Sequence, residues 1–257
     1  MSSLFDLTGQ VALISGATRG IGRAIGAAMA QHGARVIVSS ESADDCRRVA
    51  DEFCARGWDA IAIAADVAER AQVERLFALS VEQRRRIDIL VCCAGVAPPP
   101  GPSAAVSDHD WDRVFNVNLR GAHWLTSLAL PAMAERRHGS VILISSIAGL
   151  RGNKGLGVYA LSKAALAQLA RNLSVEWGPS NVRVNAISPG LIQTDFAQPL
   201  LASEEFMRRR IAATPLRRVG TPEDIAGVAV MLAAPAGAFI TGQNLIVDGG
   251  TLIGDGS

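Results

Sequence analysis

The chain has a single tyrosine among its 257 residues, although it has seven phenylalanines and four tryptophans. It also has almost no excess charge of either sign, since the formal net charge is +1 with 19% charged residues. A surface without excess positive charge attracts nucleic acid poorly. We therefore expect a small-molecule partner and no nucleic acid.

The sequence has no apolar run near the ~20 residues that a membrane-spanning helix needs. It also opens without the basic start, apolar stretch and cleavage site of a secretory signal. Its cysteines, Cys46, Cys54, Cys92 and Cys93, form no CxxC pair and have no accompanying His cluster. This pattern favours reduced intracellular thiols over a disulfide framework or a zinc site. We expect a cytoplasmic protein without a membrane segment or a metal.

Short and nearly continuous apolar runs alternate with longer helical patterns along the chain, as in parallel strands that helices cover on both faces. The predicted strands are 10–15, 34–40, 59–66, 87–93, 140–146, 182–188 and 244–249. The predicted crossover helices are 21–32, 42–56, 69–85, 107–135, 158–177 and 222–234. This alternation predicts an α/β fold, a Rossmann-like, doubly wound, seven-stranded parallel sheet flanked by helices on both faces. Residues 1–257 are expected to form one domain, with a partly helical substrate loop at about 191–216.

The stretch SGATRGIGRAIG, residues 15–26, follows the first predicted strand and opens the first predicted helix. Gly16, Gly20 and Gly22 are not spaced as the common G-x-G-x-x-G. They nevertheless permit a tight turn and a close approach to a pyrophosphate, whose charge would lie at the N–H groups of the helix start. An ordinary glycine turn between strand and helix is the competing interpretation.

Residues after the second and third predicted strands bear on the choice of dinucleotide. An acid at the end of the second strand binds the ribose hydroxyls of NAD, whereas a nearby base accommodates the 2′-phosphate of NADP. Here Ser40 and Glu41 follow that strand, and Glu41 would repel a 2′-phosphate if it faced the ribose, whereas Arg19 would attract one. A solvated Glu41 near a helix start is the other interpretation. The sequence favours NAD, and Asp66 is expected to bond the adenine amino group.

Tyr159 and Lys163 are four residues apart, so a helix over 158–177 places both on one face. An ammonium beside a phenol favours the phenolate, which lowers the pKa of the phenol toward the range where it exchanges a proton with an alcohol. Ser146, at the end of the fifth predicted strand, lies on the ligand-binding edge of such a sheet. Alone, such a Tyr/Lys pair is more typical of a lysine snorkelling beside a half-buried tyrosine. Together with the glycine loop, it predicts an oxidoreductase interconverting a secondary alcohol and a ketone.

Several motifs occur in this order along the chain: SGATRGIG at 15, DV at 66, CAG at 93, NVNL at 116, SS at 145, YALSK at 159, ISPG at 187 and TGQNLIVDGG at 241. With these motifs the sequence resembles the classical short-chain dehydrogenase/reductase family over about residues 8–250. The resemblance implies a bound NAD or NADP that carries the hydride. It also implies a homotetramer built through the helices at 107–135 and 158–177 and through the last strand.

The resemblance also implies roles for individual residues. Tyr159 would be the acid/base, Lys163 would lower its pKa and hold the nicotinamide ribose, and Ser146 would orient the substrate. Asn118 would hold a water linking the lysine to solvent, and a satisfied mid-helix asparagine is the alternative. The implied dinucleotide contacts are Gly16, Thr18, Arg19, Gly20, Ile21, Gly22, Ser40, Glu41, Asp66, Val67, Ala94, Gly95, Tyr159, Lys163, Pro189, Gly190, Ile192 and Thr194.

One motif departs from the family. Where the family usually has Asn-Asn-Ala-Gly, this chain has Cys92, Cys93, Ala94 and Gly95. The missing amides put in doubt a bracing between strands and one polar contact near the adenosine, but they leave the proton-transfer residues in place. We expect activity to survive, and a buried structural thiol is favoured over a reactive Cys93.

The expected substrate pocket is mostly apolar, which indicates an uncharged or lightly polar substrate, although Arg151, Asn153, Lys154 or Gln193 could reverse this. Its expected walls are Ser146, Ala148, Leu156, Tyr159, Leu191 and Phe196. A non-catalytic dinucleotide-binding module is the alternative function, because fold alone does not establish activity. Within the enzyme class, a 3-oxoacyl carrier-protein reductase is a further alternative, with only Arg136 and Arg137 as a weak trace of a basic docking patch.

Overall fold

The computed structural model describes residues 4–254 and contains one sheet in which each strand runs parallel to its neighbours. Its seven strands lie in the order β3-β2-β1-β4-β5-β6-β7, which confirms the predicted doubly wound α/β fold. The strands are β1 Val11–Ser15, β2 Arg35–Ser39, β3 Ala60–Ala62, β4 Ile89–Cys92, β5 Gly139–Ile144, β6 Val182–Pro189 and β7 Asn244–Val247. The domain was predicted to extend over residues 1–257, and its first and last three residues, 1–3 and 255–257, lie outside the described part of the chain.

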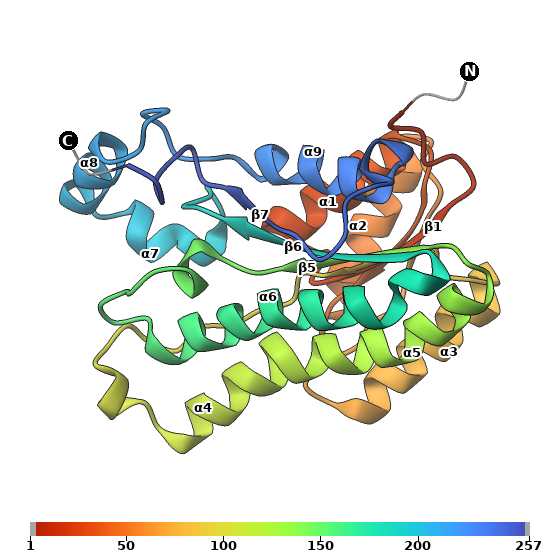
Figure 1. Ribbon diagram of the computed structural model, residues 1–257, viewed down its shortest axis with the longest axis horizontal. Helices are drawn as coiled ribbons and strands as arrows, with labels where there is room; N and C mark the ends of the chain where they lie inside the picture. Colours follow the sequence, from red (N-terminus) through yellow and green to blue (C-terminus); the bar gives the residue numbers. More distant parts are fainter. Residues whose placement is uncertain (1–3, 255–257) are drawn as a thin grey trace.

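Helices cover both faces of the sheet (Figure 1). The α-helices are α1 Gly20–Gln31, α2 Ala43–Ala55, α3 Arg70–Arg84, α4 Asp108–Phe115, α5 Gly121–Glu135, α6 Gly157–Trp177, α7 Gln198–Leu201, α8 Glu204–Ala212 and α9 Pro222–Ala233. The shorter helical turns are η1 Ser103–Ala105, η2 Asn116–Arg120, η3 Ile147–Gly149, η4 Gly178–Ser180, η5 Asp195–Ala197 and η6 Pro235–Gly237. In the described part of the chain, no helix is both long and apolar enough to cross a membrane.

Two apolar cores lie on opposite faces of the sheet because successive side chains of a strand point to opposite sides. In β1, Ala12 and Ile14 pack with α1, α2 and α9, whereas Val11 and Leu13 pack with α3, α5 and α6. The near-continuous burial of β1 explains why its sequence reads as an apolar run rather than an alternating one.

The third strand is shorter than expected, since the prediction of 59–66 becomes three residues. Hydrogen bonds to β2 nevertheless continue past its end, from the amide of Ile63 to the carbonyl of Val38 at 3.1 Å and from Ala65 to Ser40 at 2.9 Å. The backbone therefore still delivers Asp66 to the edge of the sheet.

The predicted helix over 107–135 is divided into α4, one π-helical turn (η2) and α5. Asn118 lies in this turn and bonds through its side chain to the backbone of Val96, which fixes the turn against the loop after β4. Turns of this kind insert one extra residue into a helix and are frequent at functional sites.

The carboxyl ends of the strands gather the predicted site residues. The glycine loop follows β1, Ser146 follows β5 and Gly190 follows β6. Helices α7 and α8 lie at the same end of the sheet as the start of α6 (Figure 1). This edge is where ligands bind in open α/β sheets.

Candidate active site

The glycine loop forms a narrow cradle between β1 and α1. Gly16 has φ +70°, and a Cβ built there would lie 2.7 Å from the amide nitrogen of Ala94. A Cβ at Gly22 would lie 2.1 Å from the carbonyl oxygen of Gly16. The N-cap residue of α1, Arg19, makes no side-chain cap hydrogen bond. The N–H groups of the first turn of a helix are free to bind an anion, and glycine at positions 16 and 22 lets the backbone approach it closely. Both features fit a pyrophosphate.

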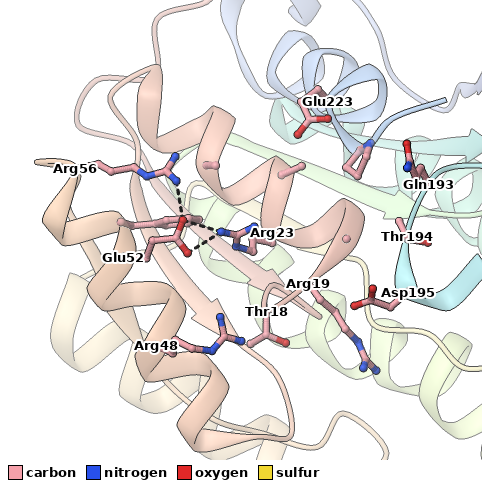
Figure 2. Close-up of a pocket in the computed structure, with 15 residues that line it drawn as sticks. Thr18, Arg19, Arg23, Arg48, Glu52, Arg56, Gln193, Thr194, Asp195 and Glu223 are labelled. Carbon is pink, nitrogen blue, oxygen red and sulfur yellow. Dashed lines mark hydrogen bonds and ion pairs between the residues drawn. The ribbon is translucent and has the colours of Figure 1, made fainter. Parts of the chain in front are cut away.

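A cavity of about 630 Å³ lies beside this cradle. Figure 2 shows Thr18 and Arg19 on one side of it, and Gln193, Thr194 and Asp195 on the other. Thr194 packs over the glycine loop, since a Cβ at Gly20 would be 3.0 Å from its Cγ2. The segment after β6 therefore closes over the glycine loop.

The adenosine end of the expected cofactor site lies after β2. Ser40 is buried, and its hydroxyl lies 3.3 Å from the Cys46 Sγ, which also accepts the Ser40 amide at 3.1 Å. Glu41 is exposed. Hydrogen bonds from Arg48 and Ser42, together with the charge of Arg19, hold the pKa of Asp45 below its usual range.

Asp66 and Val67, expected at the same end, differ in exposure. Asp66 is partly exposed, and its Oδ1 accepts the amide of Ala68 at 2.9 Å. Val67 is buried, and its carbonyl lies against Gly121 at the start of α5. Only Asp66 thus presents a polar side chain here.

The structure brings Ser146, Tyr159 and Lys163 together. Ser146 is the N-cap of η3, where its Oγ accepts the amide of Ala148 at 3.1 Å, and it also makes a hydrogen bond with Tyr159. Lys163 is one turn further along α6, with its Nζ 5.7 Å from the centre of the Tyr159 ring. The helical spacing predicted for this pair is therefore present, next to the end of β5.

The electrostatics of the pair differ from the expectation that Lys163 lowers the pKa of Tyr159. Burial raises the pKa of Tyr159 to about 12, against the opposing effect of the Ser146 hydrogen bond. Burial also lowers the pKa of Lys163 to about 8. The Lys163 ammonium donates to the carbonyl of Ile144 at 2.8 Å, so its hydrogen bond goes to the backbone at the end of β5 rather than to the phenol.

Asn118 is 1% exposed, and its side chain makes three hydrogen bonds to the protein. Its Nδ2 donates to the carbonyl of Val96 and to Ser162 Oγ, both at 2.9 Å, and its Oδ1 accepts the Val96 amide at 2.8 Å. Both N–H groups are used, so a water held by this side chain would have to donate to its Oδ1. These bonds fit the alternative of a satisfied asparagine, and the role of Asn118 in holding a water stays a prediction.

The expected pocket residues do not all face open space. The Phe196 ring, from the insertion after β6, lies 5.9 Å from the centre of the Tyr159 ring, and the residue is exposed. Leu156 and Leu191 are partly exposed, whereas Ala148 is buried and adds little surface.

The remaining expected contacts, Pro189, Gly190 and Ile192, lie where β6 ends. Pro189 is the last residue of β6, and a Cβ at Gly190 would meet Cβ of Asp248 at 2.7 Å. Ile192 is buried and bridges to Gly220. The backbone at Gly190 is thus fixed against the chain that follows β7.

Two cysteines stand where the family has asparagines; Cys92 is buried and Cys93 is partly exposed. Burial raises the pKa of Cys92 to about 12 and that of Cys93 to about 11. The amide of Cys93 still donates to the Ser15 carbonyl at 3.2 Å, so the backbone pairing to β1 is kept. Because the thiolate is the reactive form, these values favour the structural interpretation of Cys93.

Several functional neighbours were not anticipated from the sequence. Ile144 accepts a hydrogen bond from Lys163 through its backbone carbonyl. Every residue type has this carbonyl, so the contact could not be predicted from the sequence. Ser162 bonds to Asn118, 44 residues earlier, whereas Cys46 bonds to Ser40, only six residues earlier. Ser162 is three residues after Tyr159, and this helical spacing was the feature of the sequence that indicated its place near the site.

Comparisons with known proteins match nearly the whole chain to one family. A family model described as enoyl-(acyl carrier protein) reductase matches residues 16–251. The human mitochondrial dehydrogenase/reductase SDR family member 2 is 37% identical over 243 residues, covering 95% of this chain and 86% of that protein.

Two solved structures share the fold over nearly the whole chain. A gluconate 5-dehydrogenase from Burkholderia cenocepacia, in complex with NADP and tartrate, has a TM-score of 0.93 and 31% identity, covering 96% of this chain and 97% of that one. A 7α-hydroxysteroid dehydrogenase, complexed with NADH and 7-oxo glycochenodeoxycholic acid, has a TM-score of 0.93 and 34% identity, covering 97% and 98%. With its motifs, fold and relatives in agreement, this chain belongs to the classical short-chain dehydrogenase/reductase family.

Proposed function

We propose that this protein is an NAD(P)-dependent oxidoreductase that interconverts a secondary alcohol and a ketone, with Tyr159 as the acid/base. The observation that carries the proposal is the grouping of the Tyr159 phenol, Ser146 and Lys163 at the sheet edge that also holds the glycine cradle. A protein that only binds a dinucleotide has no need of this trio.

A bound nicotinamide supplies the hydride chemistry. Ser146 donates a hydrogen bond to the substrate oxygen and so orients it. The Tyr159 phenol is protonated at neutral pH, since burial raises its pKa above the ordinary range to about 12 rather than lowering it, and it gives its proton to that oxygen during reduction. The Lys163 ammonium binds the nicotinamide ribose and stabilises the phenolate left behind. In the oxidation direction, the phenolate of Tyr159 takes the proton back.

For the dinucleotide, we propose NAD(H) ahead of NADP(H). Support comes from the exposed Glu41 directly after β2 and from Asp45, whose carboxylate offsets the charge of Arg19. The solved relatives include both NADP and NADH complexes, which supports a nicotinamide dinucleotide without fixing the choice.

The experiment that tests the proposal follows nicotinamide absorbance as purified protein is incubated with NADH or NADPH and a panel of cyclic, aromatic and aliphatic ketones. We expect consumption of the dinucleotide with at least one class of ketone, and a higher kcat/KM with NADH. Binding of the dinucleotide without turnover of any ketone or its alcohol would instead support the binding-module alternative. A higher kcat/KM with NADPH would reverse the cofactor assignment alone.

The carrier-protein alternative loses one of its few supports. The Arg136 guanidinium donates to the carbonyl of Ile87 at 2.7 Å and lies 3.8 Å from the buried carboxylate of Asp88. The Arg136 side chain therefore has partners within the protein. Of the two arginines expected in a basic docking patch, this leaves Arg137.

We further propose that the chain acts as one domain in a cytoplasmic homotetramer. Large apolar side chains are exposed on the elements expected at the interfaces: Trp111 on α4, Leu161 and Val175 on α6, and Ile246 on β7. The free thiols agree with a reducing compartment. Light scattering is expected to give four times the 26.9 kDa mass of the chain, and a purely monomeric sample would remove the proposal.

A further inference from the structure

The insertion after β6, residues 191–220, is weakly packed although it reaches the site. It carries Thr194, which lies over the glycine loop, and Phe196, whose ring centre is 5.9 Å from that of Tyr159. Among the residues that the structure describes, none in α7 or α8 is buried. Segments with few buried contacts open at a small cost in free energy, so the position of Phe196 depends on how the insertion is attached.

The first attachment is the neck of the insertion, where its two ends meet. The amide of Gln193 donates to the carbonyl of Gly220 at 2.9 Å, and the amide of Gly220 donates to the carbonyl of Leu191 at 3.0 Å. These bonds join the two ends to each other. Because α7 and α8 lie between these ends, the neck alone does not fix where the two helices lie.

The second attachment is a pair of buried threonines. Thr214, two residues after α8, is 3% exposed, and Thr251, beyond β7, is 6% exposed. Their hydroxyl oxygens lie 2.9 Å apart, and each also lies 2.8 Å from a backbone carbonyl, that of Arg210 for Thr214 and that of Asp248 for Thr251. Each hydroxyl has one proton, so two of these three contacts are hydrogen bonds at any moment. The pair thus joins the end of α8 to the chain after β7 where water has little access.

The chain after β7 is braced where it carries Thr251. Both carboxylate oxygens of Asp248 accept backbone amides, that of Gly250 at 2.8 Å and that of Leu252 at 2.7 Å. The preceding carbonyl, of Val247, accepts the amide of Gly190 at 2.9 Å. Thr251 therefore lies on a fixed turn beside the end of β6.

The same turn packs closely against the segment that follows α8. The amide of Leu216 donates to the carbonyl of Gly249 at 3.1 Å. A Cβ at Gly249, where φ is +65°, would lie 2.9 Å from Cγ2 of Thr214, and a Cβ at Gly250 would lie 2.7 Å from Cγ of Pro215. The end of the described chain accordingly lies beside α8 (Figure 1). The threonine pair is thus a side-chain hydrogen bond within a close contact between the turn and the insertion.

We propose that Thr214 and Thr251 are positioning residues, whose shared contact holds the insertion so that Phe196 closes the site over Tyr159 and the bound substrate. This inference rests on the proposed function and adds the contact that sets the closed position of the substrate loop. Neither threonine is placed beside the reacting atoms, and both act through Phe196. Closing segments of this kind exclude water and complete the arrangement of catalytic groups, so a loosened insertion lowers kcat/KM.

The test removes one hydroxyl and keeps the shape of the side chain. In Thr251→Val, hydrogen exchange of the amides in residues 198–212 is expected to accelerate by roughly 3- to 10-fold, the range of one neutral hydrogen bond, without a change in α6. The kcat/KM for ketone reduction is expected to fall by a similar factor, with little change in Kd for NADH, because the glycine cradle lies after β1. Thr251→Ser keeps the hydroxyl and is expected to retain the wild-type exchange and kcat/KM.

Thr126→Val is the matched control. Thr126 is fully buried in α5, and its hydroxyl donates to the carbonyl of His123 in the same helix at 2.9 Å. This variant is expected to leave both exchange in residues 198–212 and kcat/KM unchanged. Thr214→Val combined with Thr251→Val is expected to have less effect than the product of the two single effects, because both changes remove one shared contact. Single effects that multiply would show that the two hydroxyls act separately, which would overturn the inference.

The exchange measurement needs no turnover, so it separates this inference from the proposed function. Faster exchange confined to residues 198–212 in Thr251→Val supports the attachment even if no ketone is reduced. Unchanged exchange there, or an equal acceleration throughout the sheet and its helices, would overturn the inference even if ketones are reduced. So would faster exchange together with a wild-type kcat/KM for a ketone that the protein reduces.

Discussion

Tyr159→Phe is expected to lower kcat/KM for ketone reduction by roughly 10²- to 10⁴-fold, the usual contribution of a positioned acid or base. Phenylalanine keeps the ring that packs against Phe196 but has no proton to give to the substrate oxygen. The Kd for the dinucleotide is expected to change little, because the glycine cradle lies after β1. Stopped-flow absorbance and fluorescence titration measure the two quantities on the same sample.

The pH dependence supplies a second readout for this variant. Burial raises the pKa of Tyr159 to about 12, so the phenolate needed for alcohol oxidation increases about tenfold per pH unit below that value. Wild-type oxidation is therefore expected to accelerate from neutral to alkaline pH, and the residual rate of Tyr159→Phe is expected to lack this increase. If the variant retained the wild-type rate and pH profile, Tyr159 would not be the acid/base.

Gly22→Ala is expected to weaken dinucleotide binding by roughly 10- to 100-fold. A Cβ at this position would lie 2.1 Å from the carbonyl oxygen of Gly16, a backbone atom that can move only if the cradle opens. Forcing extra volume into a packed site costs about 1–3 kcal/mol, which corresponds to that loss of affinity when the strain falls on the binding loop. Fluorescence titration with NADH gives the Kd, and circular dichroism monitors whether the variant is folded.

Gly227→Ala is the control for the change of glycine to alanine in a helix. Gly227 is exposed in α9, and a Cβ there meets no atom within 4 Å. This variant is expected to bind NADH as the wild type does and to gain about 0.5–1 kcal/mol in the free energy of unfolding, since glycine is costly in a helix. Wild-type affinity in a folded Gly22→Ala protein would show that the cradle does not hold the pyrophosphate.

The alternation of short apolar runs and helical segments predicted the sheet, because parallel strands covered on both faces are nearly continuously apolar. The location of the candidate site followed from the same pattern. Strand ends meet at one edge in a doubly wound sheet, so the glycine loop and Ser146 had to lie together. The pairing of Tyr159 with Lys163 was readable from the local 3.6-residue period of a helix.

The break of the helix at Asn118 was not readable in this way. Its side chain bonds to Val96, 22 residues earlier, and to Ser162, 44 residues later. A helical pattern contains no information on partners at such distances. The short third strand was missed for a related reason, since Ile63 and Ala65 continue the pairing to β2 after the regular strand has ended.

The sequence by itself determined the fold class, the glycine loop and the grouping of Ser146, Tyr159 and Lys163, because each depends on local period or on the order of elements. Only the tertiary structure decided the pKa values of the ionisable groups in the site. Burial raises the pKa of Tyr159 against the expected effect of Lys163, and the contact of Lys163 with a backbone carbonyl depends on the chain's path. Desolvation and the approach of distant charges are set by packing, which no local pattern in a sequence records.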